Sequence, residues 1–247
     1  MRHMAWRLGP PGVKVVILCG GRGIRSFPFT HYLPKPMMPI GGSPIVVHLI
    51  RNFVRQGFTQ FVLSAGHRSG VLIDYFQDKQ IGAEIEIVDT GDDADTGDRV
   101  LRCRDHIDGR FIVAYGDGLS DVPLARLAAF HAAHGGLATM TAVPMPSQYG
   151  VVDMQPDGRV QRMREKPLIE GHWINVGFIV FEPEVFGHWK GASLERHVLP
   201  HLVAQGAVHA YRHDGFFKSA DSYKDIMEFE ELMDAGALPW VVESVPA

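Results

Sequence analysis

The sequence predicts an α/β fold, a Rossmann-like mixed, mostly parallel sheet flanked by helices, on three observations. Apolar runs typical of strands alternate with amphipathic helical stretches along most of the chain. The chain has 247 residues, of which 46% are apolar, so one large domain can bury a full core. No linker, repeat or low-complexity tract interrupts the alternation. We therefore expect a flexible extension at 1–12 and a single domain at 13–247.

The first half of the chain contains the expected core strands. The run at 13–18 is apolar apart from one lysine, which is typical of a strand. Ser43 as N-cap and Pro44 in the first turn predict the start of a helix, and apolar residues follow at helical spacing up to Val54. Beyond this helix we expect a strand at 58–65, a helix at 69–76, an extended segment at 83–88 and a strand at 111–115.

The second half continues the alternation and adds one hairpin. Short strands at 151–154 and 160–164 flank Asp157 and Gly158, a pair typical of a hairpin turn. Around the hairpin we expect a helix at 123–134, strands at 137–143 and 174–181, a helix at 195–204, a strand at 208–212 and a closing helix at 222–235. This order predicts ligand binding at the carboxyl ends of the parallel strands.

Charge and composition argue against several classes of protein. The net charge is −4 and no basic stripe is present, so nucleic acid is not an expected partner. No apolar run approaches the roughly 18 residues of a membrane span, and residues 1–12 lack the apolar core of a signal peptide. We therefore expect a cytoplasmic protein with no membrane partner. Cys19 and Cys103 show no Cys-x-x-Cys spacing and are expected to be buried thiols.

Two polar features are expected to face solvent rather than bind metal. His131 and His134 lie at helical spacing, but no third ligand stands at a suggestive spacing, so a solvated helix face is expected. The acidic segment 92–98 lacks the glycine and the late glutamate of a calcium loop. We expect a mobile polar loop there.

A glycine-rich turn follows the first expected strand, and two cations follow the turn. Gly20, Gly21 and Gly23 let backbone N–H groups approach phosphate oxygens, because no Cβ is in the way. Arg25 and Lys35 add the positive charge that a leaving pyrophosphate needs. The turn therefore predicts a polyphosphate site, with a tight turn carrying two solvated cations as the alternative.

Two common glycine motifs do not fit this turn. A P-loop needs a lysine at a fixed spacing after the glycines, and no lysine stands there. A dinucleotide-binding turn needs a third glycine where Ser26 stands, and it opens a helix that Pro28 and Pro34 forbid. A Walker site and an NAD or FAD site are therefore disfavoured.

Carboxylates and one further cation complete the candidate site. Asp117 ends a strand between two glycines and suits Mg²⁺, which takes one or two carboxylates together with substrate phosphates. Asp221 is its candidate partner. Glu165 can accept sugar hydroxyls while Lys166 holds a phosphate. The alternatives are a turn aspartate at 117, a helix-capping acid at 221 and an exposed ion pair at 165–166.

Together these residues resemble the sugar nucleotidyltransferases, and most closely the glucose-1-phosphate cytidylyltransferases. The family opens with Gly-Gly-x-Gly-Thr-Arg-Leu followed by Pro-Lys-Pro, which correspond here to positions 20–26 and 34–36. The resemblance covers nearly the whole chain, about 15–242. Further matching segments are Gly41-Gly42-Ser43-Pro44-Ile45, Val88-Asp89-Thr90-Gly91-Asp92, Thr96-Gly97, Tyr115-Gly116-Asp117-Gly118, Glu165-Lys166-Pro167, Ile174-Asn175 and 216–221.

The resemblance implies a fold of the nucleotide-diphospho-sugar transferase type and an enzyme that joins a nucleoside triphosphate to a sugar 1-phosphate. It implies that Arg25 holds the leaving phosphates and that Lys35 bridges towards the attacking phosphate. Asp117 and Asp221 would hold Mg²⁺. The sugar phosphate and hydroxyls are assigned to Glu165, Lys166 and Asn175. The nucleotide is assigned to Cys19, Gly20, Gly21, Gly23, Gly66, Thr96, Gly97 and Gly116.

The implied substrates are CTP and a hexose 1-phosphate such as glucose 1-phosphate, with GTP, UTP or dTTP and a specialised sugar as alternatives. Ile24, Ser26 and Val176 depart from the family's threonine, leucine and glycine. The loss of the threonine hydroxyl is expected to weaken triphosphate binding, and the other two changes are expected to alter the sugar pocket. Two other function classes stay open. They are a glycosyltransferase, with an acid-x-acid metal site at 93–95, and a non-catalytic sugar-phosphate sensor. Self-association into a homo-oligomer is also left open.

Overall fold

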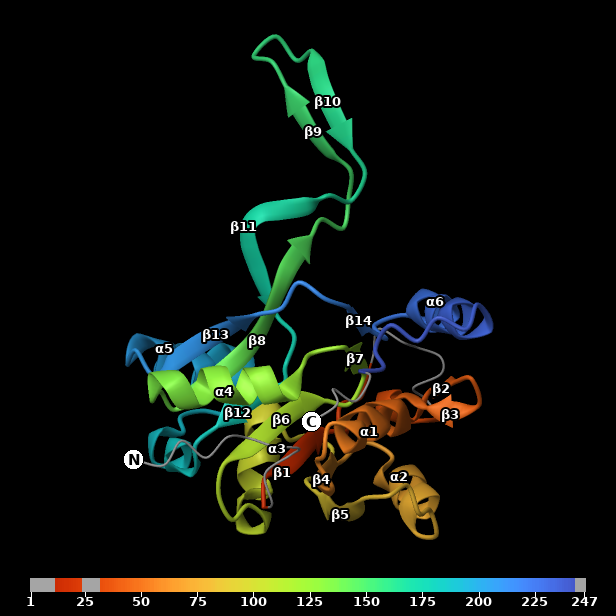
Figure 1. Ribbon diagram of the computed structural model, residues 1–247, viewed down its shortest axis with the longest axis vertical. Helices are drawn as coiled ribbons and strands as arrows, with labels where there is room; N and C mark the ends of the chain where they lie inside the picture. The colour runs from red at the N-terminus through yellow and green to blue at the C-terminus, as the bar shows by residue number, and fades with distance from the viewer. Residues whose placement is uncertain (1–11, 24–31, 243–247) are drawn as a thin grey trace.

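The computed structural model describes residues 12–23 and 32–242 (Figure 1). Its centre is an eight-stranded sheet in the order β11-β8-β12-β6-β1-β4-β5, with β13 paired to β8. β1, β4, β5 and β6 run parallel, whereas β11 and β12 pair antiparallel with their neighbours, so the predicted mixed, mostly parallel sheet is confirmed. These strands are β1 (Lys14–Leu18), β4 (Gln60–Ala65), β5 (Glu84–Asp89), β6 (Phe111–Tyr115), β8 (Ala138–Pro146), β11 (Leu168–Asn175), β12 (Ile179–Phe181) and β13 (Val208–Arg212).

β1 lies inside the sheet because its side chains are apolar on both faces. Val15 and Ile17 belong to a core cluster that includes the buried side of α1 (Ile45–Arg55). Val16 and Leu18 belong to a second cluster on the other face, which includes residues of α5 (Leu199–Ala204). The loop after β1 therefore leaves the sheet at its carboxyl edge, between the ends of β4 and β6.

Helices flank this sheet, and the remaining ones are α2 (Ser69–Phe76), α3 (Thr96–Arg102), α4 (Leu124–His134) and α6 (Tyr223–Asp234) (Figure 1). α6 begins with a capping box in which Ser222 and Asp225 satisfy each other's backbone N–H groups. Within the described ranges, no helix combines the length and the apolar character that a membrane span needs.

The start of α1 differs from the prediction. Ser43 and Pro44 form the short strand β3 (Ser43–Pro44), which pairs with β2 (Pro39–Ile40). The helix begins at Ile45, and no side chain caps it. The prediction of Ser43 as N-cap was wrong because these two residues pair with a neighbouring strand. The local sequence pattern does not reveal this pairing.

Two further segments also depart from the prediction. α3 begins at Thr96, with Asp95 as its cap and Asp98 in its first turn, so the expected mobile loop is wrong for the end of the acidic segment 92–98. The single strand expected at 174–181 is interrupted between β11 and β12. Gly177 and Phe178 have φ angles of 82° and 46° there, which turn the chain.

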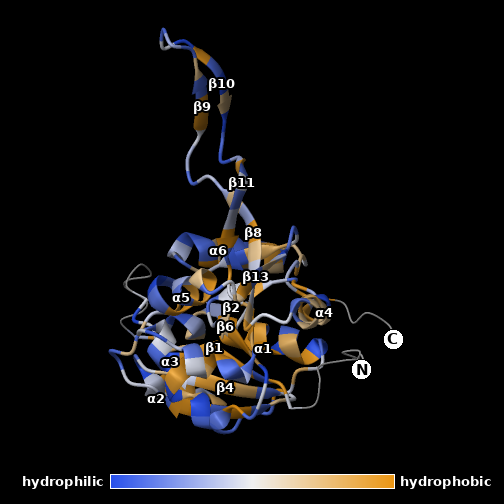
Figure 2. Cartoon of the chain, turned by 90° about the vertical axis from the view of Figure 1, so that its left-hand side faces the viewer, coloured by the Kyte–Doolittle hydropathy of each residue, from blue (hydrophilic) through white to orange (hydrophobic). Residues whose placement is uncertain are grey.

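A hairpin projects from the body of the molecule (Figure 1). β9 (Val151–Met154) and β10 (Val160–Arg164) pair only with each other, as predicted. The register places Met154 opposite Val160 and the next apolar pair, residues 152 and 163, beside them. All four side chains are exposed, and Figure 2 shows apolar and polar residues mixed along the hairpin. A two-stranded hairpin has little stability alone in water.

The histidines of α4 do not form a solvated face. His131 is buried, and its ring nitrogens lie 2.7 Å from the Thr139 hydroxyl and 3.1 Å from the Glu182 carboxylate. His134 bonds to the same hydroxyl at 2.6 Å and stacks on His209. The prediction of a solvated pair was wrong because β8 and β13 cover this side of the helix, which helical spacing alone cannot show.

Candidate active site

The ammonium of Lys35 lies between two carboxylates at the carboxyl edge of the sheet. Its Nζ atom is 2.5 Å from Oδ2 of Asp117 and 2.9 Å from Oδ1 of Asp221. Lys35 is buried and starts the 3₁₀ turn η3 (Lys35–Met37). The turn is held by the buried side chains of Met37 and Met38, and by prolines on both sides of the lysine. Three groups that the sequence places far apart therefore meet at one point.

The two carboxylates are positioned by a small antiparallel sheet. β7 (Gly118–Ser120) follows Asp117, β14 (Phe217–Ser219) precedes Asp221, and the two strands pair. The Ala220 N–H donates to the Asp117 carbonyl at 2.9 Å, and the Ser219 hydroxyl donates to Oδ2 of Asp221 at 2.6 Å. This pairing was missing from the sequence analysis, because the strands have only three residues each.

The charge of the acids decides the protonation of the lysine. Burial alone lowers the pKa of Lys35, but the charge and hydrogen bond of Asp117, together with those of Asp221, outweigh burial and raise that pKa above its ordinary value. Lys35 is therefore a cation throughout the physiological range. Two carboxylate oxygens that converge on one cation match the donor set that Mg²⁺ prefers when substrate phosphates complete its shell. The described part of the chain contains no group of three or more His, Cys, Asp or Glu side chains that could hold a metal ion. A metal ion at this site would therefore depend on substrate phosphates for further ligands.

Gly116 is required for this meeting of segments. A Cβ on Gly116 would lie 2.9 Å from both the Leu18 carbonyl oxygen and Cγ of Pro36, and 3.1 Å from the Cys19 sulfur. The end of β6 thus packs directly on the end of β1 and on the lysine turn. Cys19 is itself buried, and burial raises the pKa of its thiol, so it supplies packing and backbone here. Contact of Cys19 and Gly116 with a nucleotide stays a prediction.

Arg99 is a residue of this site that the sequence analysis missed. Its guanidinium is almost fully buried and donates to the carbonyl oxygens of Gly20 and Ala65, at 2.8 Å and 3.1 Å. It also donates to the Gly91 carbonyl and, at 2.7 Å, to the Thr90 hydroxyl. Burial lowers the pKa of Arg99. One cation therefore ties together the loops that follow β1, β4 and β5.

The glycines of these loops fall into two groups. A Cβ on Gly20 would lie 1.9 Å from Nη1 of Arg99, and a Cβ on Gly66 would lie 2.3 Å from the same atom. These two positions are glycine because the guanidinium fills the space. Among the described residues, nothing lies within 4 Å of a Cβ on Gly21, so no described neighbour closes that side of the turn. Gly23 has a φ of 57°. Arg25 lies outside the described residues, as do Ile24 and Ser26.

Thr96 and Gly97 pack against the π-helical turn η6 (Leu194–Val198). The Thr96 hydroxyl donates to Oε2 of Glu195 at 2.7 Å, and the other oxygen of Glu195 accepts from the Tyr115 hydroxyl. A Cβ on Gly97 would lie 2.7 Å from the Ala192 carbonyl. Their assignment to the nucleotide stays a prediction.

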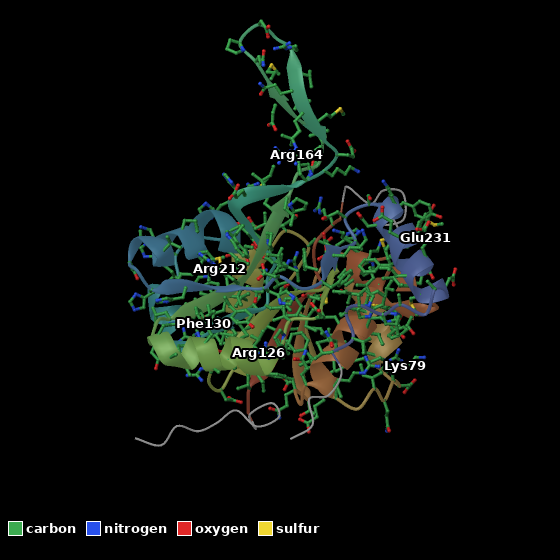
Figure 3. All side chains as sticks on the ribbon, turned by 45° about the horizontal axis from the view of Figure 1, so that its top comes forward. Lys79, Arg126, Phe130, Arg164, Arg212 and Glu231 are labelled. Carbon is green, nitrogen blue, oxygen red and sulfur yellow. The ribbon has the colours of Figure 1, made fainter. Side chains whose placement is uncertain are left out.

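Only one of the three expected sugar ligands lies near the acid pair. Asn175 ends β11, and its side-chain oxygen accepts from the N–H of Gly177, whose backbone packs on the ring of Tyr115, the last residue of β6. Glu165 and Lys166 lie beyond the other end of β11, next to Arg164 at the base of the hairpin (Figure 3). The eight residues of β11 therefore lie between them and the end of the strand at Asn175.

The side chains of Glu165 and Lys166 are exposed and make no hydrogen bond or ion pair with any described residue. Lys166 has a φ of 44°, an uncommon value for a residue with a side chain. The structure thus brings Lys35, Asp117 and Asp221 together, and leaves 165–166 apart from them. Their assignment to the sugar phosphate stays a prediction.

Comparison with known proteins places the chain in a family. Residues 14–238 match the family model described as "Nucleotidyl transferase". The chain is 32% identical to a probable glucose-1-phosphate cytidylyltransferase of Bacillus subtilis, over 93% of this chain and 100% of that protein. It is also 32% identical to a mannose-1-phosphate guanyltransferase of Neurospora crassa, over 87% of this chain and 62% of that protein.

Solved structures show the same fold. HddC from Yersinia pseudotuberculosis superposes with a TM-score of 0.71 at 22% identity, over 90% of this chain and 99% of that one. A putative glucose-1-phosphate thymidylyltransferase from Bacillus anthracis gives a TM-score of 0.68 at 18% identity, over 89% and 94% of the two chains. With the family match over almost the whole chain, these comparisons show that the protein belongs to the nucleotidyl transferase family and is one of its sugar nucleotidyltransferases.

Proposed function

We propose that this enzyme joins CTP to a hexose 1-phosphate, glucose 1-phosphate first, and releases pyrophosphate. The observation that carries the proposal is the convergence of Asp117 and Asp221 on the ammonium of Lys35 beside the open glycine turn. An oxygen of the sugar phosphate would attack the α-phosphorus in line, so no protein nucleophile is needed. Such a transfer depends on positioning and on neutralising phosphate charge, which these groups can provide.

Each group has a proposed role. Lys35 contacts the attacking and α-phosphates, and Arg25 holds the leaving pyrophosphate. The open side of Gly21 lets its backbone N–H approach the nucleotide. Mg²⁺ held by Asp117 and Asp221 would supply charge neutralisation at the α-phosphate.

The donor base is the finer part of the proposal. The relatives named above carry cytidylyl, guanyl and thymidylyl in their names, so GTP, UTP and dTTP are the alternatives to CTP. A glycosyltransferase is less well supported, because its candidate acid pair is already engaged. Asp93 is ion-paired with Arg22 at 2.8 Å, and Asp95 caps α3.

A substrate panel tests the proposal. The purified protein is incubated with Mg²⁺, one of ATP, CTP, GTP, UTP or dTTP, and one of several hexose 1-phosphates. Pyrophosphate release and the nucleotide sugar are measured, with each sugar phosphate omitted as the control. Release that requires CTP and glucose 1-phosphate supports the full proposal, and release with another pair corrects only the substrates. Release with none contradicts it and favours a sugar-phosphate sensor.

A further inference from the structure

We infer that the Lys35 ammonium and a divalent cation exclude each other at the acid pair, so that the lysine holds the two carboxylates until a metal ion displaces it. The inference rests on the proposed function, since it assigns the metal to Asp117 and Asp221. It adds an order of events. Lys35 becomes available to a phosphate only when its own place between the acids is taken.

The distances at the acid pair indicate that the ammonium and a metal ion cannot bind there together. Nζ lies 2.5 Å from one oxygen of Asp117 and 2.9 Å from one oxygen of Asp221. Mg²⁺ binds oxygens at about 2.0–2.1 Å, so an ion bonded to these two oxygens would lie in the volume that the ammonium occupies. The two cations would also repel each other strongly at such a separation in a partly buried site.

The acids are held in place without the lysine. Oδ2 of Asp221 accepts from the Ser219 hydroxyl, so its other oxygen keeps its direction when Lys35 leaves. The backbone of Asp117 is fixed by the N–H of Ala220, which donates to its main-chain carbonyl oxygen, and by the pairing of β7 with β14. The mobile partner is therefore the lysine, whose ammonium is carried on a flexible four-carbon stem.

Burial explains why the lysine is needed before the metal arrives. The side chains of Asp117 and Asp221 are only 25% and 41% exposed, and two carboxylates close together raise each other's energy. An ammonium between them compensates this repulsion in the free protein. When a divalent cation compensates this repulsion instead, the lysine ammonium is released and can bind the nearest anion. In the proposed reaction this anion is a substrate phosphate.

Binding of Mn²⁺ without nucleotide tests this competition. The signal of unbound Mn²⁺ in electron paramagnetic resonance gives the affinity, and no turnover is needed. Lys35→Met is expected to bind Mn²⁺ about tenfold more tightly than the unaltered protein, because the competing charge is gone. Lys35→Arg, which keeps the charge, is expected to bind weakly.

Two controls locate the effect. Lys79→Met removes a lysine that lies over the Tyr75 ring and bridges no acid pair, and should leave the Mn²⁺ affinity unchanged. Adding Asp117→Asn to Lys35→Met should abolish the gain. An equal or weaker affinity for Lys35→Met overturns the inference, as does a gain that survives the loss of Asp117. The Mn²⁺ assay uses no substrate, so its result is independent of the substrate panel. Failure of the proposed function and failure of this inference can therefore be told apart.

Discussion

The guanidinium of Arg99 donates to the carbonyl oxygen of Gly20 at 2.8 Å, which links α3 to the glycine turn across the carboxyl edge of the sheet. The same guanidinium holds the loops that follow β4 and β5. The start of the glycine turn is therefore held in place by a buried cation.

Replacing Arg99 by Leu should destabilise the protein. The change leaves several buried carbonyl groups without a donor, at a cost of roughly 1–3 kcal/mol each where water cannot replace it. We expect a clear fall in the urea midpoint, at a total loss of about 3 kcal/mol or more. Arg55→Ala, at an exposed position on α1, is the control and should change the free energy of unfolding by less than about 0.5 kcal/mol. Equal effects of the two variants would contradict the buried-cation role.

Alanine at Gly66, in the loop after β4, and at Gly21, in the glycine turn, should separate effects on packing from effects on ligand binding. At Gly66 the new Cβ meets the guanidinium and the Gly91 carbonyl oxygen, at 2.3 Å and 2.6 Å, so we expect a loss of about 1–3 kcal/mol in the free energy of unfolding. At Gly21 the Cβ meets no atom of the described residues, so stability should be nearly unchanged. Gly21→Ala should instead weaken nucleotide binding, as measured by calorimetry. Unchanged nucleotide affinity in that variant would show that the turn does not approach the phosphates.

The proposed chemistry depends on the charges at the acid pair. Lys35→Ala and Asp117→Asn should each lower kcat by more than about 10²-fold, the scale for losing a charge partner of the transition state. The variants are compared by pyrophosphate release after circular dichroism has shown that they fold. Lys79→Met, which removes a lysine that lies over the Tyr75 ring, serves as the control and should keep near-normal turnover. Near-normal rates in either site variant would mean that the roles are wrongly assigned.

Acid should destabilise the protein through the buried histidines. Burial, despite the opposing charge of Glu182, lowers the pKa of His131 to about 4, while an unfolded histidine titrates near 6.5. The unfolded chain therefore binds more protons below about pH 6.5, and stability is lost progressively between about pH 6.5 and 4, by up to about 3 kcal/mol. The lowered pKa of His134 acts in the same direction.

Urea unfolding at several pH values measures this loss. His131→Gln, which keeps a hydrogen-bonding side chain but does not titrate, should flatten the dependence between pH 6.5 and 5. A curve as steep as that of the unaltered protein would exclude His131 as the cause. The lowered pKa of Glu182 adds a separate loss that begins only as its carboxylate protonates, at lower pH.

The projecting hairpin predicts self-association. Its exposed apolar side chains include Met154 and Met163, and a hairpin of two strands gains stability when such a face is covered. We expect a homo-oligomer by light scattering after size exclusion. Met154→Glu with Met163→Glu should shift it towards the monomer, whereas Gln155→Glu, which adds the same kind of charge at the turn, should not. A monomeric unaltered protein at high concentration would contradict the prediction.

The sequence by itself determined the fold class and most of the elements. The apolar run of β1, the helical spacing in α1 and the Asp157-Gly158 turn are local signals, and each is read correctly without knowing what packs against it. The glycine turn, Lys35 and Asp117 were also predicted, because phosphate and metal chemistry restricts the residue types that can serve it.

Only the tertiary structure decided how these parts meet. The acid-rich start of α3 looks like a loop until Asp95 is seen to cap it, and His131 looks solvated until β8 and β13 cover it. The bridge of Lys35 between Asp117 and Asp221 depends on the pairing of two three-residue strands. Strands this short show no recognisable pattern in the sequence. Periodicity and turn chemistry act between neighbours along the chain, whereas burial and charge pairing act between segments that only folding brings together.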